Sequence, residues 1–362
     1  MNYSIVFYII GWILNFEAAF MVLPTVVALI YRESEVWCFL ATMAVCLMVG
    51  MLLVRRKPKN QIFYVAESFV AVSLSWVLLS VMGAVPFVLS GYIPNPIDAL
   101  FETVSGFTTT GASILSNVEQ LPKCLLFWRS FTHWIGGMGV LVFLLTLIPL
   151  AGGSHMNLMK AESPGPSVTR LVPKVKSTAK ILYMIYMVLT IIEIFLLLFG
   201  GMPLFDSITL SLGTAGTGGF GIKNDSIASY STYCQVIITI FMILFGINFN
   251  AYFLILIRKF RQAWESEEVR AYLLIIAAAT LAITFNVRGY FSSFAQAFQQ
   301  TIFQVASIIT TTGYATTNFD LWPEFSRTIL VLLMFVGACA GSTGGGIKVS
   351  RFLIMLKTVK KE

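Results

Sequence analysis

Apolar residues come in long, nearly uncharged runs that are separated by short polar segments. An α-helix rises 1.5 Å per residue, so about 20 apolar residues are needed to cross a hydrocarbon core about 30 Å thick. Eight runs reach this length and predict membrane-spanning helices: 3–30, 36–54, 62–90, 122–149, 180–201, 231–257, 269–287 and 326–356, the last interrupted by glycines.

Three shorter apolar segments lie between these runs, and each leads into a loop rich in glycine and hydroxyl side chains. The segments are 97–107, 203–213 and 294–309, and the loops are TTTGAS (108–113), TAGTGGF (214–220) and TTTGYA (310–315). Irregular backbone at membrane depth is tolerated only where it is buried in protein or lines water. A unit of span, half-helix, loop and span that occurs three times therefore predicts a pore.

The predicted fold is an all-α integral membrane protein with tandem membrane-pore-membrane repeats around a pore, plus an N-terminal helical hairpin. The hairpin carries no half-helix and lies outside the repeat. The predicted boundaries are a transmembrane hairpin at 1–60, a first pore repeat at 61–160, a second at 161–262 and a third, with a gating loop, at 263–362.

Composition agrees with a membrane protein: hydrophobic residues make up 57%, charged residues 11%, and the mean hydropathy is +0.83. Met1 to Ile30 lacks a basic start and continues as a span, so no cleavable signal pattern is visible. The five cysteines form no CxxC pair, and the two histidines are far apart. We therefore expect no metal cluster, no bound cofactor and no enzymatic site.

The basic residues are unevenly distributed between alternate loops. Of the 24 Lys and Arg residues, 18 fall in 55–59, 160–180, 258–270 and 348–361. The positive-inside rule makes this side cytoplasmic, so both termini are cytoplasmic and the half-helices enter from outside. The net charge of +7 thus needs no nucleic-acid partner, although the basic side could dock acidic lipid or a cytosolic protein.

The first half-helix has the charge pattern of a cation site. Pro94 and Pro96 begin it, and Asp98 and Glu102 lie in its first two turns, where acidic groups suit the positive end of a helix. Its C-terminus, with partial negative charge, then points at the loop. That arrangement favours a desolvated cation.

The last span contains five glycines between positions 337 and 346, in the sequence GACAGSTGGG. Each glycine costs a helix about 1 kcal/mol relative to alanine, so this stretch should be non-helical. A phosphate-binding loop is the rival interpretation, but that motif requires GK followed by Ser or Thr after a strand, and Ile347 separates Gly346 from Lys348. An unwound loop that acts as a gate is the better interpretation.

Four stretches resemble one known family. They are WRSFTHWIGGMGVLVF (128–143), KAESPGP (160–166), FQVASIITTTGYAT (303–316) and GACAGSTGGGIK (337–348). With the repeated TTTG-type loop, they are similar to the superfamily of Trk, Ktr and HKT potassium transporters, and in particular to its bacterial TrkH branch. The resemblance covers the whole chain, and the extra hairpin also fits that branch.

The resemblance implies four units around one K⁺ pathway, with a filter of backbone carbonyl groups and a gate below it. It places the filter at Thr109, Thr110, Gly111, Ala112, Gly216, Thr217, Gly218, Gly219, Thr311, Thr312, Gly313 and Tyr314. Its central glycines would be Gly111, Gly218 and Gly313, with Gly216 as an alternative register in the second unit. The gate would be Ala338, Cys339, Ala340, Gly341, Ser342, Thr343, Gly344, Gly345 and Gly346, with Lys348 just below.

The resemblance also implies K⁺ as the transported ion, a bacterial inner membrane location, a homodimer and a cytosolic nucleotide-binding regulatory ring. One departure is that the chain stops at Glu362, directly after the third unit. We expect a fragmentary sequence, because three units of a ring should not conduct normally alone.

Three function classes follow: a K⁺-translocating subunit, a secondary transporter of another solute or cation, and an intramembrane enzyme. Three carbonyl loops in one orientation argue against the second class. No paired catalytic groups support the third.

Overall fold

The computed structural model describes residues 3–55, 58, 65–137, 139 and 175–361, and these residues form helices and loops. Within those ranges no β-strand forms, and one isolated bridge joins Val336 to Ile347. The all-α prediction is confirmed. Most of the basic segment at 160–180 lies outside the described residues, as do the motif at 160–166 and the second half of the span at 122–149.

The chain forms two compact units. One unit consists of Met1–Thr108 with Ala112–Tyr183, and the other consists of Thr109–Gly111 with Met184–Glu362. The short segment Thr109–Gly111 therefore packs with the second and third repeats rather than with its own.

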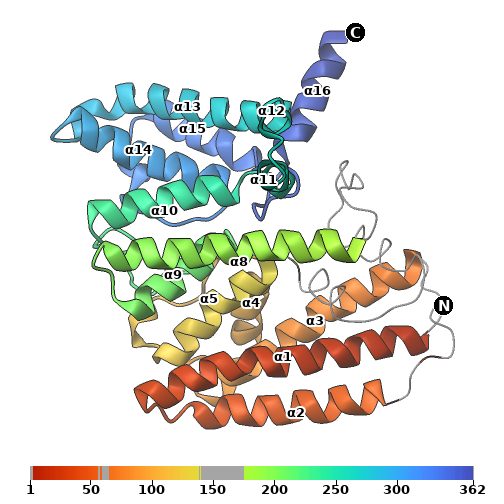
Figure 1. The fold of residues 1–362 in the computed structure, drawn as a ribbon. Helices are drawn as coiled ribbons and strands as arrows, with labels where there is room; N and C mark the ends of the chain where they lie inside the picture. Colours follow the sequence, from red (N-terminus) through yellow and green to blue (C-terminus); the bar gives the residue numbers. More distant parts are fainter. Residues whose placement is uncertain (1–2, 56–57, 59–64, 138, 140–174, 362) are drawn as a thin grey trace. The chain divides into compact units, whose positions relative to one another are not determined.

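The first unit contains the N-terminal hairpin and the first repeat, drawn from red to yellow in Figure 1. Its elements are α1 (Tyr3–Tyr31), α2 (Val36–Val54), α3 (Val65–Leu89), α4 (Pro96–Phe107), the 3₁₀ turn η1 (Val118–Gln120) and α5 (Lys123–Gly137).

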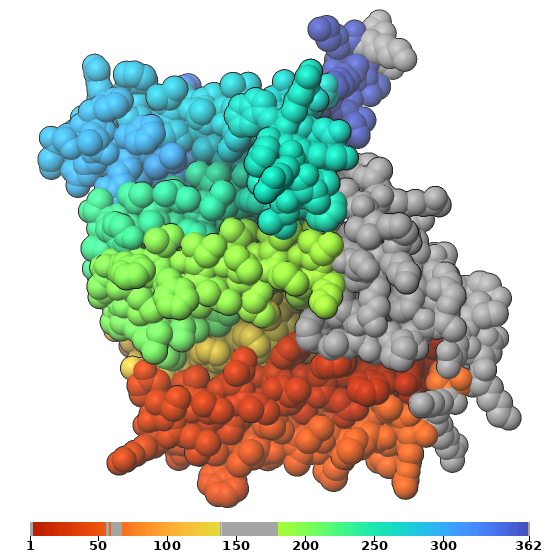
Figure 2. All heavy atoms as spheres, viewed as in Figure 1, coloured from red at the N-terminus to blue at the C-terminus, as the bar shows by residue number. Residues whose placement is uncertain are grey.

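The predicted hairpin is present, because α1 and α2 lie side by side along their length (Figure 1). Gly11 allows this close approach. A Cβ on Gly11 would lie 2.8 Å from the Leu53 Cβ and 2.9 Å from the Gly50 carbonyl oxygen. Figure 2 shows the side chains of these two helices filling the space between their ribbons on the face in view.

The second unit is drawn from green to blue in Figure 1 and includes most of α8 (Val175–Phe199). Its other elements are α9 (Leu204–Ala215), α10 (Thr232–Phe245), α11 (Phe249–Leu256), α12 (Phe260–Trp264), α13 (Glu267–Val287), η2 (Arg288–Tyr290), α14 (Phe294–Ile309), η3 (Phe319–Leu321), α15 (Glu324–Phe335) and α16 (Val349–Lys361). The core of this unit joins α13, α14 and α15 through buried Tyr272, Ile283, Ile309 and Leu330.

Among the described residues, five helices are long and apolar enough to cross a membrane, and they confirm five of the eight predicted spans: Tyr3–Tyr31, Val36–Val54, Glu67–Leu89, Lys180–Phe199 and Glu267–Tyr290. The predicted span at 231–257 is not one straight helix, because α10 and α11 meet at 90°. Gly246 ends α10, and the Asn248 side chain caps α11 by accepting a hydrogen bond from the Asn250 N–H (2.9 Å). The sequence reasoning missed this single glycine and its cap.

The three predicted half-helices are present as α4, α9 and α14, with 12, 12 and 16 residues. At 1.5 Å per residue they reach about 18–24 Å, too short to cross a membrane. Side chains begin two of them: Asn95 accepts from the Ile97 N–H (3.0 Å), and Ser293 accepts from the Gln296 N–H (3.2 Å). In α9, Asp206 in the first turn accepts from the Tyr230 hydroxyl (2.8 Å), and burial, with this carboxylate, raises the pKa of Tyr230.

Candidate functional site

The loops that follow the three half-helices share one backbone signature. The helices end at Phe107, Ala215 and Ile309. Two residues after each helix end stands a threonine with positive φ: Thr109 (55°), Thr217 (52°) and Thr311 (59°). A β-branched residue in the left-handed region is strained, and such strain is typical of functional sites. The same strained residue at the same place in each repeat indicates that the loops are built for one shared task.

Two residues further on, each loop has a glycine with positive φ: Gly111 (75°), Gly219 (75°) and Gly313 (85°). The central glycine of the second loop was expected at Gly218, or at Gly216 in the alternative register. The dihedral angles make Gly219 the counterpart of Gly111 and Gly313. Gly216 has a φ of −74°, which any residue adopts, and it corresponds to Thr108 and Thr310.

The loops pack against one another in chain order. A Cβ on Gly111 would collide with the carbonyl oxygen of Gly218, and a Cβ on Gly219 would collide with that of Thr312. Gly218 and Thr312 occupy the same position in their loops, one residue before the left-handed glycine. Thus each glycine allows the carbonyl group of the next loop to approach, whereas a Cβ on Gly313 would meet nothing within 4 Å.

The second and third loops are buried, whereas the first is more open. Thr217 and Thr312 have at most 1% of their surface exposed, while Thr110 and Ala112 are exposed. Tyr314 binds the third loop to the second half-helix, since its hydroxyl donates to the Leu210 carbonyl oxygen (3.1 Å). Ser307 in turn donates to the Tyr314 carbonyl oxygen (2.6 Å), so the chain leaving this loop is tied to its own half-helix.

The glycine-rich segment 336–348 is non-helical, as its composition predicts. α15 ends at Phe335, and α16 begins at Val349. The two ends of the segment meet, because the Gly337 N–H donates to the Ile347 carbonyl oxygen (2.8 Å). Gly341 (φ 72°) and Gly346 (φ 70°) supply backbone angles that a helix cannot use. We call this segment the glycine loop.

The glycine loop is hydrogen-bonded to the left-handed threonines of the second and third loops, Thr217 and Thr311. The Thr217 hydroxyl donates to the Thr343 carbonyl oxygen (2.9 Å), across 126 residues of chain. The Gly345 N–H donates to the Thr311 hydroxyl oxygen (2.7 Å). The predicted filter and the predicted gate are therefore in direct contact within one unit.

Two charged side chains, one of them from the glycine loop itself, also hydrogen-bond to the loop backbone. The Lys348 ammonium donates to the carbonyl oxygens of Gly344 and Gly345. One carboxylate oxygen of Glu268 accepts the N–H groups of Ala340 (2.7 Å) and Ser350 (3.1 Å). Sequence reasoning missed Glu268, because it stands 72 residues before Ala340 and no motif marks it.

The bend between α10 and α11 also binds the glycine loop. The Cys339 N–H donates to the Gly246 carbonyl oxygen (3.0 Å), and the Phe249 N–H donates to the Gly341 carbonyl oxygen (2.9 Å). A straight helix would have used these groups internally. The bend therefore supplies the backbone groups that hold the loop.

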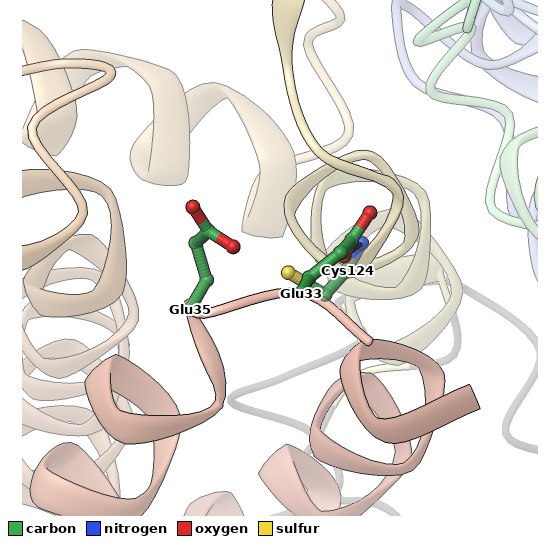
Figure 3. Close-up of side chains that lie close together, drawn as sticks. All are labelled: Glu33, Glu35 and Cys124. Atoms are coloured by element: carbon green, nitrogen blue, oxygen red, sulfur yellow. Dashed lines mark hydrogen bonds between the residues drawn. The ribbon is translucent and has the colours of Figure 1, made fainter. Parts of the chain in front are cut away.

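In the part of the chain that the structure describes, one group of possible metal ligands lies in the first unit. Side-chain ligand atoms of Glu33, Glu35 and Cys124 fall within 4.8 Å of one another (Figure 3). The two oxygens of Glu33, however, accept the N–H groups of Lys123 (2.7 Å) and Cys124 (2.9 Å). Glu33 thus caps the start of α5, and this role accounts for its position.

Comparison with known proteins agrees with this geometry. Residues 36–362 match the TrkH family model, described as a cation transport protein. The chain is 36% identical over 373 positions to the Trk system potassium uptake protein TrkH of Salmonella typhimurium, covering 100% of this chain and 76% of that protein. It is 33% identical to the Trk system potassium uptake protein TrkG of Escherichia coli, with 99% and 75% covered.

A solved structure is similar over the same extent. The crystal structure of the potassium transporter TrkH from Vibrio parahaemolyticus superposes with a TM-score of 0.85 at 32% identity, covering 100% of this chain and 76% of that one.

Proposed function

Because the chain belongs to the TrkH family of cation transport proteins, we propose that it carries K⁺ across the cell membrane as the pore-forming subunit of a potassium uptake system. It is a multi-pass membrane protein and not an enzyme. The observation that carries the proposal is the left-handed threonine and glycine found at the same positions of three loops that pack in chain order.

We assign the selectivity filter to the backbone of Thr109–Ala112, Thr217–Phe220 and Thr311–Tyr314. The second segment begins one residue later than the expected Gly216–Gly219, because Gly219 is the counterpart of Gly111 and Gly313. Each of these segments follows the C-terminal end of a half-helix, where the carbonyl dipoles amount to about half a negative charge. Carbonyl groups at such a place can replace the hydration shell of K⁺. The close approach of the Gly218 and Thr312 carbonyl groups to neighbouring glycines supports a single ion path shared by the loops.

We assign the gate to Ala338–Gly346, with Lys348 at its end. Its hydrogen bonds to Thr217 and Thr311 support a closed position against the filter. The Lys348 ammonium bound to the Gly344 and Gly345 carbonyl oxygens adds a positive charge that repels K⁺ while the loop stays there. Opening then requires these few hydrogen bonds to break together.

We further propose a bacterial inner membrane location, cytoplasmic termini, a homodimer and a cytosolic nucleotide-binding ring as regulatory partner. The exposed basic side chains of Arg258, Lys259, Arg261, Arg351 and Lys357 support docking on the cytoplasmic side. Arg351 and Lys357 lie in α16, which follows the glycine loop, and the other three follow α11, whose first residue is hydrogen-bonded to that loop.

Growth of a strain without K⁺ uptake tests the function. The 362-residue chain is compared with a fusion that adds the quarter of the Salmonella relative not covered by this chain. We expect growth at low K⁺ from the fusion, with K⁺ preferred over Na⁺, and its loss in Gly313→Asp. Equal growth of this variant, or uptake without preference for K⁺, would overturn the proposal.

A further inference from the structure

A buried carboxylate stands behind the first of the three loops. Glu102 in α4 pairs with Arg129 in α5 at 2.7 Å, and their side chains are 0% and 2% exposed. Sequence reasoning placed Glu102 among acidic groups that suit the start of the half-helix. It is the seventh residue of α4, at the end of the first two turns and five residues before the helix end, and its partner is a guanidinium.

The same carboxylate binds the chain that leaves the first loop. The Ser113 hydroxyl donates to Glu102 (3.0 Å), and so does the Ile114 N–H (3.1 Å). Arg129 also donates to the Ser113 hydroxyl oxygen (3.2 Å). One ion pair therefore fixes the two residues that follow Ala112.

The entrance to the first loop is fixed to the same helix. The Thr108 N–H (2.9 Å) and hydroxyl (2.7 Å) both donate to the Val104 carbonyl oxygen. The filter residues Thr109–Ala112 thus run between two points that are tied to α4. A short segment with both ends fixed has little freedom to change the spacing of its carbonyl groups.

The other two loops lack this carboxylate. The position five residues before the helix end holds Leu210 in α9 and Gln304 in α14. In the third loop the tie is made by Ser307 to the Tyr314 carbonyl oxygen (2.6 Å). The counterpart of Ser307 in the first repeat is Ser105. Ser105 is buried, and its hydroxyl makes no hydrogen bond within the described part of the chain. In the first loop, the Glu102–Arg129 ion pair therefore takes the place of the hydrogen bond that Ser307 makes in the third loop.

We propose that Glu102, held by Arg129, is a positioning residue that fixes Ser113 and Ile114 and thereby sets the preference of the first filter segment for K⁺. This inference rests on the proposed function. A loop with fixed spacing of its carbonyl oxygens favours the ion whose size matches that spacing, whereas a flexible loop can contract around the smaller Na⁺.

The test measures how K⁺ and Na⁺ raise the melting temperature of the purified full chain, because an ion that binds the native state stabilises it by mass action. This readout needs no conduction. The variants are Ser113→Ala, Glu102→Gln and the double variant Glu102→Leu/Arg129→Met. Ser105→Ala is the matched control, since it removes a buried serine hydroxyl of the same half-helix that makes no tie.

The double variant separates positioning from stability. Removing one member of a buried ion pair is destabilising, but replacing both by apolar residues of similar volume is often neutral. We expect the double variant to melt near the wild-type temperature without ion, yet to lose about tenfold in K⁺ over Na⁺ affinity. Ser113→Ala should lose a similar factor, and Ser105→Ala should lose none.

The outcomes point to different conclusions. If the double variant and Ser113→Ala keep the wild-type preference for K⁺, the pair is structural only and the inference is overturned. If the wild-type chain gains no more from K⁺ than from Na⁺, the proposed function fails, and this inference fails with it.

Discussion

The carbonyl oxygen of Gly218 occupies the place where a Cβ on Gly111 would stand. Residue 111 must therefore be glycine for two separate reasons: its φ of 75° and the backbone of the neighbouring loop. The same relationship is found between the second and third loops, where the Thr312 carbonyl oxygen occupies the place of a Cβ on Gly219. Contacts of this kind make the loops depend on one another, and the predictions below use that dependence.

Gly219 and Gly216 should respond oppositely to alanine. Gly219→Ala places a Cβ against the Thr312 carbonyl group and adds left-handed strain of about 1–2 kcal/mol. Gly216→Ala meets neither problem at a φ of −74°. Growth at low K⁺ in the fusion described above should be lost in the first variant and kept in the second.

Gly201→Ala controls for strain alone, because Gly201 also has positive φ (80°) with nothing within 4 Å of an added Cβ. It should retain K⁺ preference. If Gly216→Ala loses the preference for K⁺ and Gly219→Ala keeps it, Gly216 and not Gly219 is the central glycine of the second loop.

The hydroxyl groups of Thr217 and Thr311 should hold the gate closed. Valine has the shape of threonine but cannot make either hydrogen bond to the glycine loop. Each loss should weaken the closed state by about 1 kcal/mol, a factor of about five. The double variant should raise unregulated K⁺ flux in proteoliposomes by about 5–30-fold.

Thr209→Val is the matched control, since within the described residues this buried threonine bonds only inside α9, to the Phe205 (2.8 Å) and Asp206 (3.1 Å) carbonyl oxygens. Serine at 217 and 311 should restore the wild-type flux. If the valine double variant conducts no more than Thr209→Val, the contact between filter and glycine loop has no part in gating.

Glu268 should act as an anchor of the glycine loop. Glu268→Ala removes the acceptor of the Ala340 and Ser350 N–H groups, whereas Glu268→Gln keeps an oxygen in place. The buried thiol of Cys339 reports on the loop, because it is 0% exposed. With the other four cysteines replaced, a hydrophilic maleimide should label Cys339 at least about fivefold faster in the alanine variant.

Glu267→Gln provides the control on the neighbouring carboxylate, which makes an exposed ion pair with Lys357 instead. An exposed pair contributes about 0–1 kcal/mol, so labelling should stay at the wild-type rate. Equal acceleration in both variants would mean that general loosening of α13, and not the anchor, exposes the thiol.

Glu33 should stabilise the first unit as a helix cap. Loss of a cap costs about 0.5–2 kcal/mol, so Glu33→Ala should lower the melting temperature by about 2–4 °C. Glu35→Ala removes a carboxylate that accepts a hydrogen bond from the exposed Ser34 hydroxyl, and it should change the melting temperature little. A stabilisation of the wild type by Zn²⁺ that both variants abolish would contradict the cap and support a metal site.

Hydropathy and composition alone predicted five of the spans, the three half-helices and the loops after them. These features are local: the length of an apolar run, a proline or a capping residue at its start, and a cluster of glycines at its end. The non-helical segment at 336–348 was predictable for the same reason, because the cost of glycine in a helix does not depend on the rest of the fold.

The tertiary structure decided which residues in these segments touch. Gly219 rather than Gly218 takes the central place, because the choice depends on backbone angles and on the Thr312 carbonyl group of another repeat. Glu102 pairs with Arg129 because α4 and α5 pack together, and no spacing rule joins two residues 27 positions apart. The bend at Gly246 frees the carbonyl oxygen of this residue from the helix, and that oxygen accepts a hydrogen bond from the Cys339 N–H. Sequence determines which segments can unwind, but the hydrogen bonds that an unwound backbone requires come from distant parts of the chain, so only the folded arrangement selects their partners.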